Sequence, residues 1–204
     1  LRVEEGDRVQ KGQILMLLDD TRAGPQFRET YSKWQSLSAR AARLRAESYG
    51  IALGFPQEVQ ENPRLVEIET QAYGVRQNAM AEQMLALEAQ RNVLLREVEL
   101  TEPLVNEGVV SEVELLRLKR QAAQLQGQVA QVKASYLSRA SDELVQIESE
   151  LGQVGETLVA HREALARTNV VAPANGIAKD ISVTTVGAIV NAGEVIMEIV
   201  PVDD

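Results

Sequence analysis

The chain has 204 residues, of which 45% are hydrophobic and only 3% aromatic, and it contains no cysteine. The absence of cysteine excludes a disulfide framework and thiolate metal sites. The net charge of −9 argues against a nucleic-acid partner, because such a partner requires a basic surface. With so few aromatic side chains, aliphatic residues must hold most of the chain together, and this favours long helices over a thick core.

Two segments near the ends of the chain, 6–16 and 187–197, share one pattern at a constant offset of 181 residues. Each copy consists of a turn glycine, a short strand, a second turn glycine and an apolar strand. Since a lone hairpin is marginal in water, we expect 1–20 and 168–204 to be the two halves of one small β-domain. The turn glycines are Gly6 and Gly12 in the first half, and Gly176, Gly187 and Gly193 in the second.

The second half also has a strand and turn at 170–178 that the first half lacks. We therefore expect the first half to be incomplete and the protein to continue before residue 1. No apolar run reaches the roughly 18–20 residues that cross a bilayer.

Residues 21–167 are rich in Ala, Leu, Gln, Glu and Arg, with apolar positions at helical spacing. The pattern predicts three helices at about 25–53, 64–107 and 111–167. Within the last two helices the apolar residues recur at alternating steps of three and four residues, and this spacing predicts an antiparallel coiled coil. The third helix is shorter than the other two placed end to end, so it cannot pack along both of them in a single row. We therefore expect the first helix to lie beside the other two over part of their length.

The apolar phase of both long helices slips by one residue. In 64–107 the phase of Leu65, Ile68, Ala72, Val75 and Ala79 gives way to that of Met80, Met84, Leu87, Arg91, Leu94, Val98 and Thr101. In 111–167 the slip is centred near residue 140. Both slips lie about 30 residues from Gly108, so we expect the two helices to change phase at the same level.

The reversal between these helices, at about 104–111, forms the tip of the hairpin. Asn106 and Gly108 suit a helix end, and Ser111 with Glu114 predicts a capping box. Four apolar residues crowd the turn: Leu104, Val105, Val109 and Val110. They form either a contact site or a cluster that packs on itself, and the sequence leaves both readings open.

The sequence contains no arrangement of residues that is typical of a catalytic site. His161 is the only histidine, and it falls on the apolar seam, where we expect a packed polar residue. No catalytic triad, phosphate-binding glycine loop or cluster of metal ligands appears. The sequence therefore predicts no catalytic, cofactor-binding or metal-binding residues, and a protein that is not an enzyme.

The two β-halves resemble biotinyl and lipoyl domains, but the junction at 18–21 lacks the lysine that such carriers modify. A lipoyl-like domain split by a helical hairpin resembles the hemolysin-D family of periplasmic adaptors, or membrane fusion proteins. Three helical segments make the chain most similar to the type I secretion members that export proteases, lipases and haem-binding proteins. The resemblance implies a mainly α fold, with a long antiparallel coiled-coil hairpin inserted into a small split lipoyl-like β-domain.

The same resemblance implies a periplasmic protein, anchored to the inner membrane outside these residues, that carries secreted protein cargo. Its implied partners are an inner-membrane ABC transporter, a TolC-like outer-membrane channel and further copies in a ring of about six. Many members dock on the channel through an arginine, a leucine and a serine or threonine at the tip. Leu104 and Ser111 match two of these positions, Leu100 stands in place of the arginine, and Val105, Val109 and Val110 offer apolar contacts.

Three alternatives remain at this level. The nearest is the adaptor of a drug-efflux pump. A structural coiled-coil tether with no transport role is the second, and a carrier subunit of a carboxylase or dehydrogenase is the third.

Overall fold

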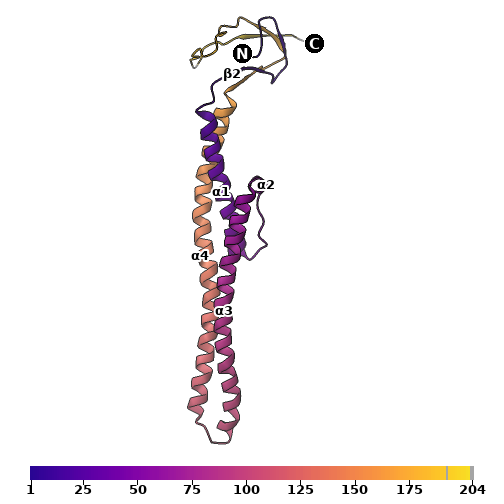
Figure 1. Cartoon of the computed structure of the whole chain (residues 1–204). Helices are drawn as coiled ribbons and strands as arrows, with labels where there is room; N and C mark the ends of the chain where they lie inside the picture. The colour runs from indigo at the N-terminus through magenta and orange to yellow at the C-terminus, as the bar shows by residue number, and fades with distance from the viewer. Residues whose placement is uncertain (192, 203–204) are drawn as a thin grey trace. The chain divides into compact units, whose positions relative to one another are not determined.

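A computed structural model describes residues 1–191 and 193–202, and 65% of these residues are helical. The helices are α1 (Ala23–Tyr49), α2 (Gln57–Gln60), α3 (Pro63–Asn106) and α4 (Glu112–Ala166). The strands are β1 (Arg8–Val9), β2 (Ile14–Leu17), β3 (Asn169–Val171), β4 (Gly176–Lys179) and β5 (Glu198–Pro201). The predicted fold class is confirmed (Figure 1).

The chain forms two compact units, Leu1–Lys33 with Val154–Asp204, and Trp34–Gln153. The first contains all five strands and the adjoining ends of α1 and α4. The second contains the remainder of α1, α2, α3 and most of α4. The boundaries between these units fall inside α1 and α4, so they do not test the predicted domain limits at 20 and 167, which stay a prediction.

In the first unit, strands from the two ends of the chain pair with each other. The order β1-β4-β5 makes one antiparallel sheet, and β2 pairs with β3 in a second. Hydrogen bonds outside the strands extend the pairing: the Gly12 and Gly6 N–H groups donate to the carbonyls of Ala172 and Ala178, each at 2.8 Å. The core beneath is small and aliphatic: Val3, Val9, Leu15, Ala172 and Ala178, with Met197 and Ile199 packed against it.

The internal repeat is visible in the backbone. Gly6 and Gly12 have φ of 96° and 85°, and their counterparts Gly187 and Gly193 have 88° and 86°. This left-handed region strongly favours glycine. The turns also share hydrogen bonds at the same offset, since Gln10 N–H donates to the side chain of residue 13 and Asn191 N–H to that of residue 194.

The strands expected in the second copy are not formed within the described residues. Between Asp180 and Met197 the backbone is irregular, and the first strand after it is β5. The physical reason is pairing: β4 and β3 provide partners for β1 and β2, whereas no described segment does so for the second copy. Val186, Ile189 and Val195 are consequently exposed.

In the second unit, α3 and α4 run antiparallel, and α1 lies beside them near the start of α3 (Figure 1). Ion pairs fix the register: Arg76 Nη1 lies 3.0 Å from Glu143, and Lys119 Nζ lies 2.8 Å from Glu102. The expected three-helix layer is present, and α1 is its most buried member, since Ala39, Ala41 and Leu44 have no exposed surface.

The helix ends lie within a few residues of the predicted ones, and α1 shows the largest difference. We expect helix to residue 53, but α1 ends at Tyr49. Gly50 adopts φ +65°, and its N–H still donates to the carbonyl of Ala46 at 3.0 Å. A glycine in the left-handed conformation is a common helix terminator. Within the described residues, none of the helices is both long and apolar enough for a membrane span.

The predicted seam of the first part of α3 is wrong. Ile68 and Val75, assigned to the apolar phase, are exposed. Glu69 and Arg76 face the other helices instead, where they pair with Arg43 of α1 and Glu143 of α4. Buried charged side chains on α1 require partners of opposite charge. The side of α3 that carries Glu69 and Arg76 therefore faces the other helices, and the side that carries Ile68 and Val75 faces solvent.

Candidate functional site

The hairpin tip is a well-defined turn rather than a loose loop. Val109 N–H donates to the carbonyl of Leu104, and Gly108 N–H to that of Val105, each at 2.9 Å. Gly108 has φ +74°. This pair of bonds around a left-handed glycine is a Schellman motif, which satisfies the last carbonyls of a helix. Residues beyond the turn are thereby held at fixed positions.

The apolar residues of the tip divide into two groups. Val105 packs against the buried cluster of Val98, Leu115 and Leu118, so it closes the end of the hairpin core. Val110 is also half-buried. By contrast, Leu100, Leu104 and Val109 are exposed, with 58%, 40% and 69% of their surface accessible. The reading of a cluster that packs on itself therefore holds for Val105, and the reading of a contact site stays a prediction for the exposed side chains.

Ser111 lies beside this exposed group and begins α4. Its Oγ accepts a hydrogen bond from Val113 N–H at 3.3 Å. The expected capping box is only half formed, because the Glu114 carboxylate binds Arg117 at 2.6 Å. That guanidinium holds the pKa of Glu114 below its ordinary value, so the carboxylate remains charged and paired instead of reaching back to the start of the helix.

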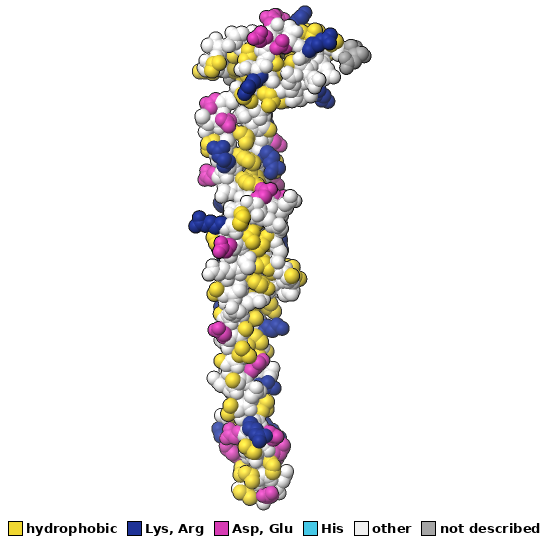
Figure 2. Space-filling view, turned by 45° about the vertical axis from the view of Figure 1, so that its right-hand side comes forward, with side chains coloured by type: hydrophobic (Ala, Val, Ile, Leu, Met, Phe, Trp, Pro, Cys, Tyr) yellow, Lys and Arg dark blue, Asp and Glu magenta, His cyan; other side chains and the backbone are white. Residues whose placement is uncertain are grey.

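Paired charges surround the hairpin just behind the tip. Glu102 of α3 binds Lys119 of α4, and Glu114 binds Arg117. Figure 2 shows blue and magenta side chains near the lower end of the hairpin, with hydrophobic side chains and a further magenta side chain below them. Exposed apolar side chains among charged ones suit docking into a complementary protein surface.

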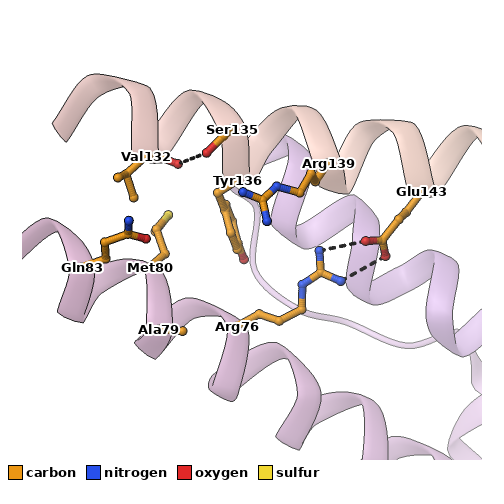
Figure 3. Close-up of a pocket in the computed structure, with 9 residues that line it drawn as sticks. All are labelled: Arg76, Ala79, Met80, Gln83, Val132, Ser135, Tyr136, Arg139 and Glu143. Carbon is orange, nitrogen blue, oxygen red and sulfur yellow. Dashed lines mark hydrogen bonds and ion pairs between the residues drawn. The ribbon is translucent and has the colours of Figure 1, made fainter. Parts of the chain in front are cut away.

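The expected phase slip in α3 does not occur, because Ile68 and Val75 are exposed and lie off the seam from the start. Its expected position lies level with that of the slip in α4. Residues 76–83 of α3 and 132–143 of α4 line one open cavity of about 430 Å³ (Figure 3). Met80 and Val132 form its apolar wall, and the Tyr136 side chain points from α4 towards α3. Burial of the Tyr136 hydroxyl raises its pKa, and nearby Glu47 acts in the same direction.

A charged network lies between this cavity and α1. Glu47, whose side chain is wholly buried, lies 2.6 Å from Arg43 and 3.1 Å from Arg76. Arg43 also binds Glu69, and Arg76 also binds Glu143, which lowers the pKa of Glu143. The sequence analysis missed this network, although Arg43 and Glu47 are four residues apart on the apolar side of a helix.

The structure offers no catalytic arrangement at His161. Its Nδ1 lies 2.9 Å from Thr30 Oγ1, which makes it a polar contact between α4 and α1, as predicted. Among residues 1–191 and 193–202, no group of His, Asp or Glu side chains is arranged to hold a metal ion. Asp19, at the junction that carries lysine in prosthetic-group carriers, accepts hydrogen bonds from the N–H and hydroxyl of Thr21.

The fold is similar to that of a solved protein structure. The soluble domain of LipC, a membrane fusion protein of a type I secretion system, has a TM-score of 0.62 and 21% identity, covering 98% of this chain and 94% of that one. The chain thus has the fold of a membrane fusion protein's soluble domain. No protein-family model matches it.

Two curated relatives narrow the class. The type I secretion system membrane fusion protein PrsE of Rhizobium meliloti is 26% identical over 253 residues, covering 98% of this chain and 57% of the relative. The proteases secretion protein PrtE of Dickeya chrysanthemi is 25% identical, covering 100% of this chain and 56% of the relative. The chain therefore spans little more than half the length of these relatives.

These findings confirm the resemblance to membrane fusion proteins of type I secretion that the sequence indicates. Such proteins form a non-enzymatic family, in agreement with the prediction that the chain is not an enzyme. The relatives named are secretion proteins, so the efflux alternative has less support.

Proposed function

We propose that this chain is the coiled-coil and lipoyl-like part of a periplasmic adaptor for type I protein secretion. In this role it links an inner-membrane ABC transporter to a TolC-like outer-membrane channel. The observation that carries the proposal is a rigid hairpin end with exposed apolar side chains, on a fold shared with a type I secretion membrane fusion protein.

The docking surface proposed on the channel side consists of the exposed tip. Leu104 and Val109 provide the apolar contacts, and Ser111 provides a hydroxyl at the start of α4. Leu100 stands one turn further back, where it adds apolar area. Val105 and Val110 support this surface from within the hairpin end.

The remaining features of the adaptor follow from the same proposal. The helical insertion occupies 21–167, the lipoyl-like halves are 1–20 and 168–204, and the protein is periplasmic with its inner-membrane anchor outside these residues. Several copies, of the order of six, form a ring around the path of the secreted cargo. Gly6 and Gly12 hold the first β-half against the second, because their N–H groups donate to the carbonyls of Ala178 and Ala172. The expectation of a turn at Gly176 is wrong, since this glycine lies within strand β4.

Secretion by cells that carry tip variants tests the proposal. Val109→Asp places a charge in the apolar contact and should reduce export of the cognate cargo at least tenfold, with the protein still present at its normal level. Val113→Asp provides a matched control, because Val113 is similarly exposed but lies outside the proposed surface. It should leave export within twofold of normal.

Normal export by the Val109→Asp protein would contradict channel docking at the tip and favour a structural tether. A carrier subunit makes a different prediction, namely a covalent biotinyl or lipoyl group on the purified protein. Mass spectrometry that gives the unmodified mass is the result we expect.

A further inference from the structure

The cavity between α3 and α4 lies where the three-helix layer ends. Helix α1 stops at Tyr49, and its buried Glu47 lies 3.1 Å from Arg76, which lines the cavity. Beyond that level, α3 and α4 continue as a pair without the third helix (Figure 1). The cavity therefore occupies the step from three helices to two, and all the residues that line it belong to the second unit.

The cavity has the size of a small-molecule site. Its volume of about 430 Å³ falls within the roughly 300–1,000 Å³ that is typical of ligand pockets. It runs along residues 76–83 of α3 and 132–143 of α4, which is roughly 10–15 Å at ~1.5 Å per residue. This volume, spread over that length, makes the cavity narrow. A narrow cavity suits an extended chain better than a ring system.

One wall of the cavity is apolar. Ala79 and Met80 form it on α3, and Val132 and the ring of Tyr136 form it on α4 (Figure 3). The methionine side chain adapts to ligands of irregular shape, because its thioether chain is flexible and polarizable. An aliphatic chain that packs along this wall removes apolar surface from water, and this contributes favourably to binding.

The charges around the cavity leave one guanidinium without a partner. Arg76 binds both Glu47 and Glu143, so its charge is already balanced. Arg139 lines the cavity from α4, and within residues 1–191 and 193–202 its side chain makes no hydrogen bond or ion pair. Because the whole chain has a net charge of −9, only this local guanidinium attracts an anion to the cavity.

An unpaired arginine beside an apolar wall matches one class of ligand. A guanidinium offers two parallel N–H donors to a carboxylate, and such pairs are strong and directional. One unpaired positive charge matches a ligand with one negative charge. Arg139 and Val132 are seven residues apart on α4, or roughly 10 Å at ~1.5 Å per residue, so the charged and apolar ends of the ligand are separated by a short chain.

We infer that this cavity binds a small aliphatic carboxylate, with the carboxylate on Arg139 and the aliphatic chain against Met80 and Val132. Arg139 is exposed, so the ligand keeps its charge near solvent and buries only its apolar part. This avoids the cost of a fully desolvated ion pair. The site is separate from the docking surface proposed at the tip, and neither depends on the other.

NMR of methyl-labelled methionine locates the ligand and measures its affinity in the purified chain. The four methionines are Met16, Met80, Met84 and Met197, and of these only Met80 lines this cavity. Octanoate should shift the Met80 signal in a saturable way, with a dissociation constant of the order of 1 mM or below. Met16 and Met197, in the first unit, should not shift.

Octanol is the control ligand, because it has the same chain without the charge. It should bind at least tenfold more weakly than octanoate, since it cannot form an ion pair with Arg139. A Met80 signal that does not move with octanoate, or that moves equally with octanol, would overturn the inference.

Arg139→Gln removes the unpaired charge and should weaken octanoate binding at least tenfold while leaving octanol binding unchanged. Arg120→Gln is the matched control, because Arg120 is another exposed arginine of α4 that does not line the cavity. It should bind octanoate within twofold of normal. Equal losses in the two variants would show attraction to overall charge, and would contradict a site at Arg139.

Filling the cavity tests its place in the fold. Ala79→Trp puts a large side chain into the cavity and should abolish octanoate binding, measured by calorimetry. Ala81→Trp makes the same change at an exposed position of α3 outside the cavity, and it should bind normally. Undiminished binding by a folded Ala79→Trp chain would place the ligand elsewhere. If that variant unfolds, Arg139→Gln still decides the question, because its side chain is exposed.

A ligand that binds only the folded chain also stabilises it. Octanoate should therefore raise the midpoint of thermal unfolding of the unchanged chain and of Arg120→Gln, but not that of Arg139→Gln. Equal shifts in all three would contradict binding through Arg139. These assays need neither transporter nor channel, so their failure would leave the proposed adaptor function untouched.

Discussion

At the scale of single residues, two glycines have opposite surroundings. Gly176 lies in the centre of a sheet, where an added Cβ would collide with the Val200 carbonyl oxygen and lie 2.8 Å from Ile199 Cγ2. Gly127 lies in a helix with no atom within 4 Å of an added Cβ. The same substitution should therefore have opposite effects on stability.

We expect Gly176→Ala to destabilise the β-unit by about 1–3 kcal/mol, because the backbone must shift. Gly127→Ala should stabilise the helical unit by about 0.5–1 kcal/mol, because alanine is the better helix former. Hydrogen exchange of amides within each unit measures both changes. Protection that is unchanged in β4 and β5 of Gly176→Ala would contradict the close contact.

The buried network gives a second prediction at this scale. Glu47→Ala leaves Arg43 buried without one of its two carboxylate partners, and such a loss costs about 3–5 kcal/mol. Replacing both residues, as in Arg43→Met with Glu47→Leu, should cost much less. Thermal unfolding of the single and double variants decides this, and equal losses in both would show that charge pairing at this site is unimportant.

The pair of Arg76 and Glu143 predicts a pH effect. The guanidinium lowers the pKa of Glu143 from its ordinary 4.5, so the folded state favours the charged carboxylate. Its stabilisation is present above that ordinary value and is lost as the pH falls through the lower, folded pKa. Glu143→Gln should therefore destabilise the chain at pH 7 and have progressively less effect as the pH falls below 4.5. Because Glu143 is partly exposed, the expected loss is below about 1 kcal/mol.

The sequence predicts the repeat glycines well, because a left-handed turn leaves a direct mark on residue type. It does not predict which phase of α3 turns inward. Ile68 and Val75 follow the heptad pattern, yet they are exposed, because the neighbouring α1 buries Arg43 and Glu47 and selects the charged phase. A pattern within one helix contains no information about the partner that it meets.

At the scale of elements, a narrow row of buried apolar side chains between α3 and α4 stabilises the hairpin. Leu118 of α4 is 2% exposed and packs in the cluster that closes the hairpin end, whereas Leu116, two residues away, is 52% exposed. The helices themselves are well predicted, since long periodic segments and a capping serine fix their ends to within a few residues. The division of tip residues into supporting and exposed ones depends on side-chain packing that the sequence does not reveal.

Leu118→Ala should cost about 2–4 kcal/mol, because it leaves a cavity in the seam. Leu116→Ala should change the stability of an isolated chain by less than about 0.5 kcal/mol. Chemical denaturation followed by circular dichroism compares the two. Similar losses in both would place Leu116 inside the seam, contrary to the structure.

At the scale of the whole molecule, strands from the two ends of the chain pair with each other, and the residues between them form the helices of the hairpin. This topology places an exposed tip at the far end of the second unit from the three-helix layer. The strands of the second β-copy are predicted from the sequence but are not formed among the described residues. A strand forms only where a partner exists, and identical turns do not provide one.

The most direct test of the account is cross-linking from the tip in cells. A photoreactive residue in place of Val109 should link the protein to the outer-membrane channel when the transporter is present, and the same residue in place of Gln128 should not. Adducts with the channel from position 109 alone are the predicted result. Equal adducts from both positions, or none from position 109 in cells that secrete normally, would contradict docking through the hairpin tip.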